Sequence, residues 1–308
     1  MNKLIRYIDP RAYFRFFKKV LSKINLIQEA LGRIEARQIN YLDLDISDSE
    51  FRVYSQWGED GIIQYLLSKI EIKDKVFVEF GVENYLQSNT RFLLQNNYWS
   101  GLVIDGNKSD IEYLKKDQIY WAHNIKAENA FITKNNIESI LTDNGIKPDL
   151  GILSIDIDGN DYWVWESIES FYPRIVICEY NSIFGPDAKV TTCYRDDFTR
   201  YSEHHSGVLY GASISALDDL AKRKGYSLVA GNTAGNNIFF VRNDLLSNLK
   251  VLSPQEAYQK ANFREYKDKN GKLTYEDFEQ RLINIQNEKI FDIDLQKILK
   301  LKEVVRIP

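Results

Sequence analysis

The residues that decide the fold are ILSIDIDGNDYWVWE, 152–166, in which a short apolar run ends in three closely spaced aspartates and leads into a helix-forming segment. A short apolar run bounded by turn residues is typical of a strand buried on both faces of a parallel sheet. The stretches VFVEFGVEN (76–84), LVIDG (102–106) and VICEYNS (176–182) also join an apolar run to acidic residues. This repetition predicts parallel strands whose carboxyl ends gather polar side chains at one edge of a sheet.

The remaining elements are predicted from the alternation of apolar runs with helical periodicity. Strands are expected at 76–81, 102–105, 119–122, 152–157 and 175–180, with helices near 88–97, 109–116, 134–143, 161–171 and 213–224. Two more strands, 226–230 and 237–241, flank the turn-rich sequence GNTAGN and are expected to form an antiparallel hairpin. The sequence thus predicts an α/β fold with a doubly wound, Rossmann-like sheet of five parallel strands and a C-terminal hairpin.

The composition places these elements in one domain with additions at both ends. The chain has 308 residues, of which 44% are hydrophobic, and this is enough for one full-sized α/β core. We expect a helix within 1–45, the α/β domain at 50–245 and a charged C-terminal appendage at 246–308, with helices near 254–261 and 275–287. The net charge of −4 gives no general attraction for nucleic acid. Two cysteines without metal-site spacing, no bilayer-length apolar run and no recognisable signal peptide favour a cytoplasmic protein.

The N-terminal helix combines an apolar repeat with a basic composition. Apolar residues at 13, 17, 20, 24, 27, 31 and 34 follow one another at alternating steps of four and three, the a/d pattern of a helix that packs on a partner. Seven lysines and arginines precede residue 25, against a single aspartate. Three interpretations stay open for residues 1–40: packing on their own domain, self-association, and docking at the inner membrane surface.

Glu79, Gly81 and Asp105 form the first candidate ligand-binding group. A glycine at the carboxyl end of a first strand lets a ligand approach the backbone, and the nearby Glu79 carboxylate can hold an ammonium or a hydroxyl. Asp105 ends the second strand, where an acid can accept both hydroxyls of a ribose, although Asp-Gly is also a common turn. The sequence lacks the G-x-G-x-x-G that a pyrophosphate needs, which disfavours NAD or FAD.

A second acidic group gathers at the ends of the fourth and fifth strands. Asp156, Asp158 and Asp161 would repel one another, which favours the binding of a cation, although Asp158 and Asp161 can instead simply cap the following helix. Asp156 is expected to face the positive charge of a cofactor. A ligand set that suits Mg²⁺ or Mn²⁺ is expected from the oxygens of Asp156, Asp158, Glu179 and Asn181. The same oxygens can instead bind sugar hydroxyls without a metal.

Histidines and aromatic residues near the same edge are further candidates. His204 and His205 fall in the long connection after the fifth strand, where a histidine that titrates near neutral pH can take a proton from an acceptor. Their alternative is to be solvated loop residues. The aromatic side chains that can stack on a sugar ring are Trp57, Trp99, Trp163, Trp165 and Tyr210.

Several motifs, in order, resemble those of bacterial FkbM-like methyltransferases: SQWGEDGII (55–63), FVEFGVEN (77–84), LVIDG (102–106), LSIDIDGNDYWVWE (153–166), CEYN (178–181), YGAS (210–213) and FFVRND (239–244). The resemblance spans roughly residues 50–245. It implies the class I methyltransferase sheet and S-adenosyl-L-methionine (SAM) as cofactor. Proteins of this kind often act in the decoration of surface polysaccharides.

The resemblance also implies roles for individual residues. It implies that Ser55, Gln56, Glu79, Gly81 and Asp105 bind the cofactor. From their positions in the predicted elements, Asp156 is also expected to bind the cofactor, and the expected catalytic residues are Asp158, Asp161, His204 and His205. The sequence departs from the family at IDIDGND, where an acid followed by valine, glutamate and glycine is more common, so the roles of Asp158 and Asp161 stay undecided.

The expected function is in-line transfer of a methyl group from SAM to a hydroxyl of a sugar or surface glycan, assisted or not by a divalent metal. Two alternatives remain: a non-catalytic scaffold or assembly protein on the same domain, and another enzyme that binds a nucleotide sugar. A domain without a ligand gains nothing from a cluster of carboxylates, which argues against the scaffold.

Overall fold

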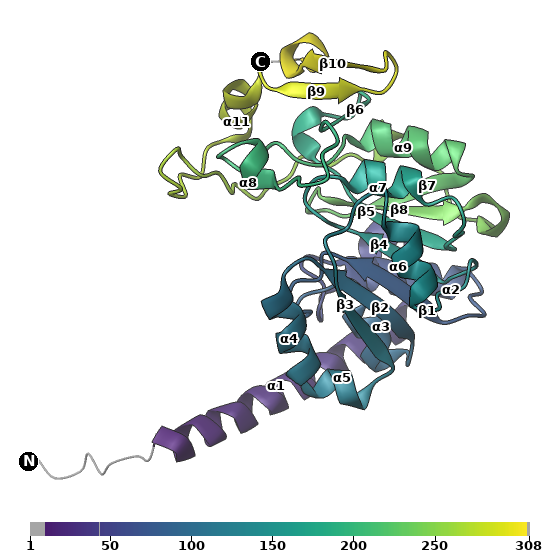
Figure 1. The fold of residues 1–308 in the computed structure, drawn as a ribbon. Coiled ribbons are helices and arrows are strands. Elements are labelled where there is room, and N and C mark those ends of the chain that lie inside the picture. The colour runs from purple at the N-terminus through teal and green to yellow at the C-terminus, as the bar shows by residue number, and fades with distance from the viewer. Residues whose placement is uncertain (1–9, 43, 307–308) are drawn as a thin grey trace, which may run out of the picture.

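In the computed structural model, which describes residues 10–42 and 44–306, the central sheet has seven strands in the order β3-β2-β1-β4-β5-β8-β7 (Figure 1). The strands are β1 (Val76–Phe80), β2 (Ser100–Asp105), β3 (Ile125–Asn129), β4 (Ile152–Ile155), β5 (Ile175–Glu179), β7 (Tyr226–Gly231) and β8 (Asn237–Arg242). Strands β1 to β5 pair in parallel, whereas β8 runs antiparallel to both β5 and β7. The predicted doubly wound sheet with its closing hairpin is confirmed.

One predicted strand is wrong. Residues 119–122 belong to a short helix, α5 (Gln118–Ala122), and the edge strand is β3, which follows it. Asp117 explains the helix, because its side chain accepts a hydrogen bond from the backbone N–H of Ile119 and so caps the first turn.

Helices cover both faces of the sheet. One face carries α6 (Ile137–Asp143), α7 (Asp161–Ser167), α9 (Ile214–Arg223) and α10 (Pro254–Ala257). The other face carries α2 (Glu59–Lys69), α3 (Arg91–Asn96), α4 (Lys108–Lys116) and α5. Successive strand residues enter opposite cores, as Phe77 and Val78 do, because side chains alternate across a strand.

The C-terminal segment joins an insertion of the α/β domain to make a second small sheet. Its order is β10-β9-β6, where β6 (Val190–Thr191) follows β5 in the chain and β9 (Lys289–Asp292) and β10 (Lys297–Lys300) lie near the C-terminus. Helix α11 (Phe278–Ile285) buries Leu282 and Ile285 in a third apolar cluster. The elements that complete the chain are α8 (Arg200–Glu203) and the 3-10 turns η1 (Ile46–Ser49), η2 (Ser182–Phe184), η3 (Asn243–Leu245) and η4 (Leu301–Glu303). The expected appendage therefore contributes α10 to one face of the central sheet, and its strands β9 and β10 lie with β6 beside the α/β domain (Figure 1).

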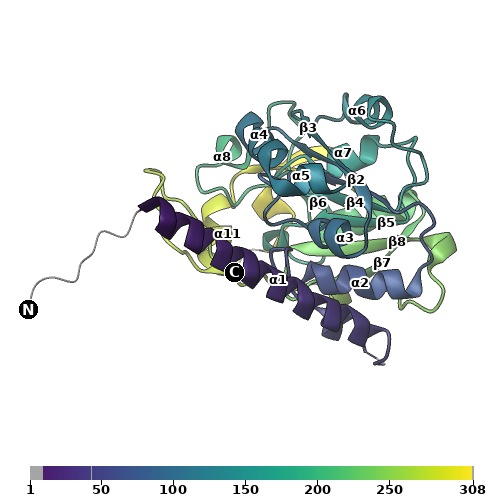
Figure 2. The same cartoon turned by 90° about the horizontal axis from the view of Figure 1, so that it is seen from below.

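The expected N-terminal helix is present as α1 (Pro10–Ile39), whereas residues 1–9 and 43 of that segment lie outside the described residues. Its C-terminal half packs beside α2, and its N-terminal half extends beyond the body (Figures 1 and 2). The repeat residues Phe17, Ile24 and Leu31 are 49%, 51% and 57% exposed, so the apolar stripe faces away from the domain. Among the described helices, none combines the length and the apolar character needed to cross a bilayer.

Candidate functional site

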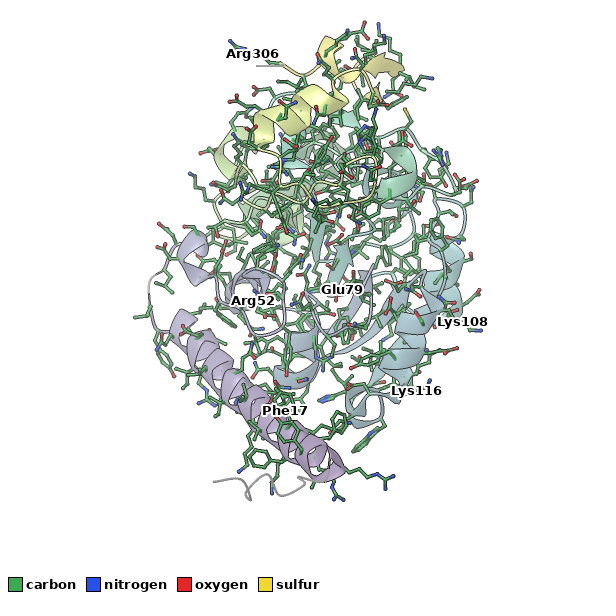
Figure 3. The ribbon with its side chains drawn as sticks, turned by 90° about the vertical axis from the view of Figure 1, so that its left-hand side faces the viewer. Phe17, Arg52, Glu79, Lys108, Lys116 and Arg306 are labelled. Carbon is green, nitrogen blue, oxygen red and sulfur yellow. The ribbon has the colours of Figure 1, made fainter. Side chains whose placement is uncertain are left out.

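A cavity of about 690 Å³ lies at the carboxyl ends of β1, β2, β4 and β5. The strand order reverses at β1, and the crevice at such a reversal is where open α/β sheets bind ligands. Gly81, Asp105, Asp156 and Glu179 line the cavity from these four strand ends. Asn237 joins them, because β8 is antiparallel and pairs Asn237 with Glu179 at the same edge. Figure 3 shows another lining residue, Glu79, among the strands at the centre of the molecule.

Gly81 lets β1 and β4 end close together. It has a φ of +69°, and a Cβ at this position would lie 1.6 Å from the carbonyl oxygen of Asp156. Only glycine fits both constraints. The floor of the cavity is therefore backbone, as close approach of a ligand requires.

The Glu79 carboxylate anchors the loop after β1. It accepts hydrogen bonds from Ser88 Oγ (2.5 Å), the Asn89 N–H (2.8 Å), and both the N–H and the Oγ1 of Thr90. Burial raises the pKa of Glu79, while these hydrogen bonds act in the opposite direction. Glu79 lines the cavity as expected for a cofactor-binding residue, but its oxygens already serve the wall itself.

Asp105 organises the rim between β1 and β2. One oxygen accepts from the Glu83 N–H and the other from the Asn107 N–H, both at 2.7 Å. These bonds hold the carboxylate at the cavity with lone pairs left for two ligand hydroxyls. Next to it, Ile104, Ala130, Phe131 and Ile132 form an apolar section of the lining. A flat apolar ring beside a diol would be accommodated by this arrangement.

Asp156 and Glu179 are neighbours at the ends of β4 and β5. Ile155 and Cys178 are paired across these strands, and Asp156 and Glu179 are the residues that directly follow them. Their carboxyls interact electrostatically with each other. Burial raises the pKa of both groups well above their ordinary values, and the nearby carboxylates, including Asp158, raise them further. The pair therefore retains a proton under conditions in which isolated carboxylic acids are ionised.

Three oxygen acceptors in the cavity wall have no hydrogen-bond partner among residues 10–42 and 44–306. They are Glu179 Oε2, Asn160 Oδ1 and Asn237 Oδ1, and all three are buried. Buried polar atoms are nearly always satisfied, so these oxygens indicate a ligand that brings donors or positive charge.

Arg200, at the start of α8, was not anticipated from the sequence. Its guanidinium lies 3.0 Å from Asp158 Oδ1 and 3.6 Å from Glu265 Oε2, and it also donates to the carbonyl of Gly207. It stacks 4.7 Å from the centre of the Tyr210 ring. Asp158 has a φ of +54°, an uncommon conformation for aspartate, and burial raises its pKa while Arg200 lowers it. The long chain separation between Asp158 and Arg200 left no sequence signal for this pair.

Of three further predicted site residues, Asp161 and Ser55 lie outside the cavity lining and Gln56 is part of it. Asp161 is fully buried and accepts from the N–H groups of Ile157 (2.8 Å) and Gly159 (2.9 Å), which fixes the turn that carries Asp158. Gln56 lines the cavity, whereas Ser55 is buried outside the lining and bonded to Asp60.

Asp60 and its neighbour Glu59 shape the 53–58 turn, and neither was singled out from the sequence. Asp60 Oδ2 accepts from three successive backbone N–H groups, those of Val53, Tyr54 and Ser55. Burial raises the pKa of Asp60 to about 6. The sequence feature that could have identified them is the Gly-Glu-Asp of SQWGEDGII, which forms the N-terminus of α2.

The expected metal-ligand set is not assembled. Asn181 donates to the carbonyls of Val208 (2.8 Å) and Tyr210 (3.0 Å) and accepts from the Ile183 N–H, so its amide is committed to the fold. In the described part of the chain, no group of three or more His, Cys, Asp or Glu is arranged to hold a metal ion. Asp156 and Glu179 line the cavity, whereas Asn181 does not.

His204 and His205 lie beside the C-terminal segment, outside the cavity lining. His204 Nδ1 is 2.7 Å from Ser206 Oγ, and the His205 ring contacts Tyr266. Of the expected aromatic residues, Trp57 stacks on Phe263 near Gln56, while Trp165 belongs to the core under α9.

Comparisons with known proteins give distant structural likenesses alone. No family model matches the sequence, and no curated protein matches it. Among solved structures, M. capricolum TrmK in complex with S-adenosyl-homocysteine (SAH) is 12% identical, with a TM-score of 0.37, over 68% of this chain and 76% of that chain. The N-terminal domain of EvdMO1 with SAH bound is 11% identical, with a TM-score of 0.35, over 68% and 95%. An O-methyltransferase family protein from Burkholderia thailandensis is 8% identical, with a TM-score of 0.37, over 75% and 62%.

Proposed function

We propose that this protein is a SAM-dependent methyltransferase that acts on a hydroxyl of a sugar or glycan. The observation that carries the proposal is the charge of the cavity. Seven carboxylate side chains line it (Glu79, Glu83, Asp105, Asp156, Asp158, Glu179 and Glu265), against one arginine. Such a wall attracts a cofactor with a sulfonium and an ammonium, and repels the phosphates of NAD or a nucleotide sugar.

The lining also has the right order of chemical groups for SAM. The apolar section at Ala130–Ile132 suits an adenine, and Asp105 beside it suits the ribose hydroxyls. Gly81 and Asp156 face each other at the centre of the crevice, where the methionine part would lie against the backbone. The unpartnered Asn160 and Asn237 oxygens are acceptors for the ammonium.

The reaction needs an acceptor oxygen that is aligned and deprotonated. When bound, SAM supplies a methyl group on a sulfonium, and the acceptor oxygen forms its bond to that carbon as the carbon–sulfur electrons return to sulfur. Asp158 is the carboxylate that is half-exposed to the cavity and fixed by Arg200, so it is placed to take the hydroxyl proton. The resemblance of the motifs to FkbM-like methyltransferases favours a glycan acceptor. No metal is required by this scheme.

The proposal is tested by calorimetric titration with SAM and SAH, with and without Mg²⁺, using NAD and a nucleotide sugar as controls. Micromolar binding of SAM and SAH, with none of either control, is the expected result. Binding of the phosphate-containing ligands instead of SAH would overturn the cofactor assignment and favour the nucleotide-sugar alternative. If none of these ligands bound, the scaffold alternative would be favoured.

Asp105→Ala is expected to weaken SAH binding by about 30-fold or more, because two hydrogen bonds from ribose hydroxyls to a carboxylate are lost. The same titration measures it, and thermal unfolding checks that the rim, which Asp105 also holds, stays folded. Asp110→Ala is the matched control, since Asp110 lies on α4 close by but outside the cavity lining. Equal losses in both variants would contradict the role given to Asp105.

The α1 stripe is proposed to be covered by a second copy of α1. The alternating four-three spacing continues without interruption from Tyr13 to Ile34, and all its members except the partly buried Val20 are exposed, as a coiled-coil seam would be in one isolated chain. Ile24→Asp is expected to convert a dimer to a monomer in sedimentation experiments, whereas Ser22→Asp on the opposite side should not. A monomeric wild type that binds anionic vesicles would favour the membrane alternative instead.

A further inference from the structure

The buried side chain of Arg281 on α11 has no ion-pair partner among the described residues. Arg281 is 5% exposed, and its Nε is buried without a hydrogen-bond partner. Within residues 10–42 and 44–306, no carboxylate forms an ion pair with it, and the guanidinium carbon lies 5.7 Å from the centre of the Phe278 ring. Burial lowers the pKa of Arg281, which is the expected cost of an unpaired buried cation. Leu282 and Ile285 anchor the helix in the third apolar cluster, so Arg281 cannot turn away freely.

Arg281 lines a second, small cavity of about 20 Å³ next to the main one. The two cavities share Arg200 and Glu265 in their walls. Tyr210 also lines the small cavity and interacts electrostatically with Arg281 on one side and with Glu179 on the other. The small cavity therefore adjoins the acidic cluster at which methyl transfer is proposed.

The local charges leave Arg281 as the unmatched cation. Arg200 is neutralised by Asp158 and Glu265. The nearest acid along α11, Asp277, attracts Arg281 without forming an ion pair, because its carboxylate accepts from the Gln280 N–H to cap the helix, and Arg264 adds repulsion. Retaining a buried, unpaired arginine is unfavourable for folding, so an anion from outside the chain is the partner that would compensate it.

Resting on the proposed function, we propose that Arg281 and Tyr210 bind an anionic group of the acceptor, so that the enzyme methylates an acidic sugar. The anion lies in the small cavity, and the reacting hydroxyl lies across the shared wall at Asp158. The volume of about 20 Å³ is little more than one water molecule needs, so only the oxygens of an anion can enter it from the shared wall, and a flat carboxylate is less bulky there than a tetrahedral phosphate. Arginine pairs with carboxylates in two parallel hydrogen bonds, which would satisfy the free Nε.

The first test needs no ligand. Arg281→Met keeps the length and the apolar stem and removes the charge, so it is expected to raise the melting temperature of the ligand-free protein by about 2 °C or more. Arg281→Lys, which retains a buried cation, is expected not to do so. A destabilised Met variant would show that Arg281 is already paired within the fold, which would overturn the proposal.

The second test uses D-glucuronate, D-glucose 6-phosphate and D-glucose as probes in titrations of the 308-residue chain. Wild type is expected to bind glucuronate at least tenfold more tightly than glucose, and Arg281→Met should lose that preference. Tighter binding of the phosphate would keep the site but assign it to phosphorylated sugars. Equal binding of glucuronate and glucose, or no binding of any probe, would overturn the proposal.

SAH affinity, measured in the same samples, separates this proposal from the proposed function. It should be unchanged in Arg281→Met. Charge-dependent sugar binding without SAH binding would support the anion site and refute the methyltransferase.

Discussion

Gly81→Ala is expected to lower the free energy of unfolding by about 4 kcal/mol or more and to abolish SAH binding. The left-handed backbone conformation alone costs an alanine about 1–2 kcal/mol. The larger part comes from the Cβ, which would lie 1.6 Å from the Asp156 carbonyl oxygen, so the ends of β1 and β4 must move apart. Chemical denaturation gives the stability, and calorimetry gives the SAH affinity.

Gly145→Ala is the matched control for this effect. Gly145 has a φ of +75° and nothing within 4 Å of the position of its Cβ, so it carries the same backbone penalty without the clash. It is expected to lose about 1–2 kcal/mol and no cofactor affinity. A similar loss of stability in both variants would show that the close approach of β1 and β4 is not under steric constraint.

The strand ends that surround Gly81 were predictable because their signal is local. Asp105, Asp156 and Glu179 each follow an apolar run that is buried on both faces, and parallel strands bring their carboxyl ends to one edge. The error at 119–122 has a local cause as well, because Asp117 caps a helix at these residues. The true edge strand, β3, is polar and only partly buried, so it lacks the continuous apolar run by which the inner strands were predicted.

The residues that escaped prediction act over long chain separations. Arg200 reaches Asp158 across forty-two positions, and Arg281 reaches the site from a segment that the sequence marked as peripheral. Conversely, Asp161 and Asn181 are of residue types that often bind ligands, but in the structure their side chains form hydrogen bonds with backbone groups that pack against them. Side chains that bind ligands and those that bind the chain's own backbone are identical in type, so spacing alone could not separate them.

The preference of the protein for SAM over SAH is expected to rise with pH. The two ligands differ by the positive charge on sulfur, so the ratio Kd(SAH)/Kd(SAM) reports the negative charge near that atom. Burial and mutual repulsion raise the pKa of Asp156 and of Glu179, so the pair is protonated at low pH and becomes more negative as pH increases. The ratio should therefore increase between pH 5.5 and 8.5 by about tenfold or more, the effect of one nearby charge at short range.

Glu179→Gln should remove much of this pH dependence while sparing SAH binding. The amide keeps the shape of the side chain and cannot ionise, so Asp156 would titrate without a competing carboxylate, at a lower pKa than in wild type. The rise in the SAM preference is then expected at lower pH and with smaller amplitude. Glu112→Gln on α4 makes the same change in net charge outside the cavity lining and should retain the wild-type profile. If Glu112→Gln shifted the profile as much as Glu179→Gln, overall charge rather than the Asp156–Glu179 pair would set the selectivity for the sulfonium.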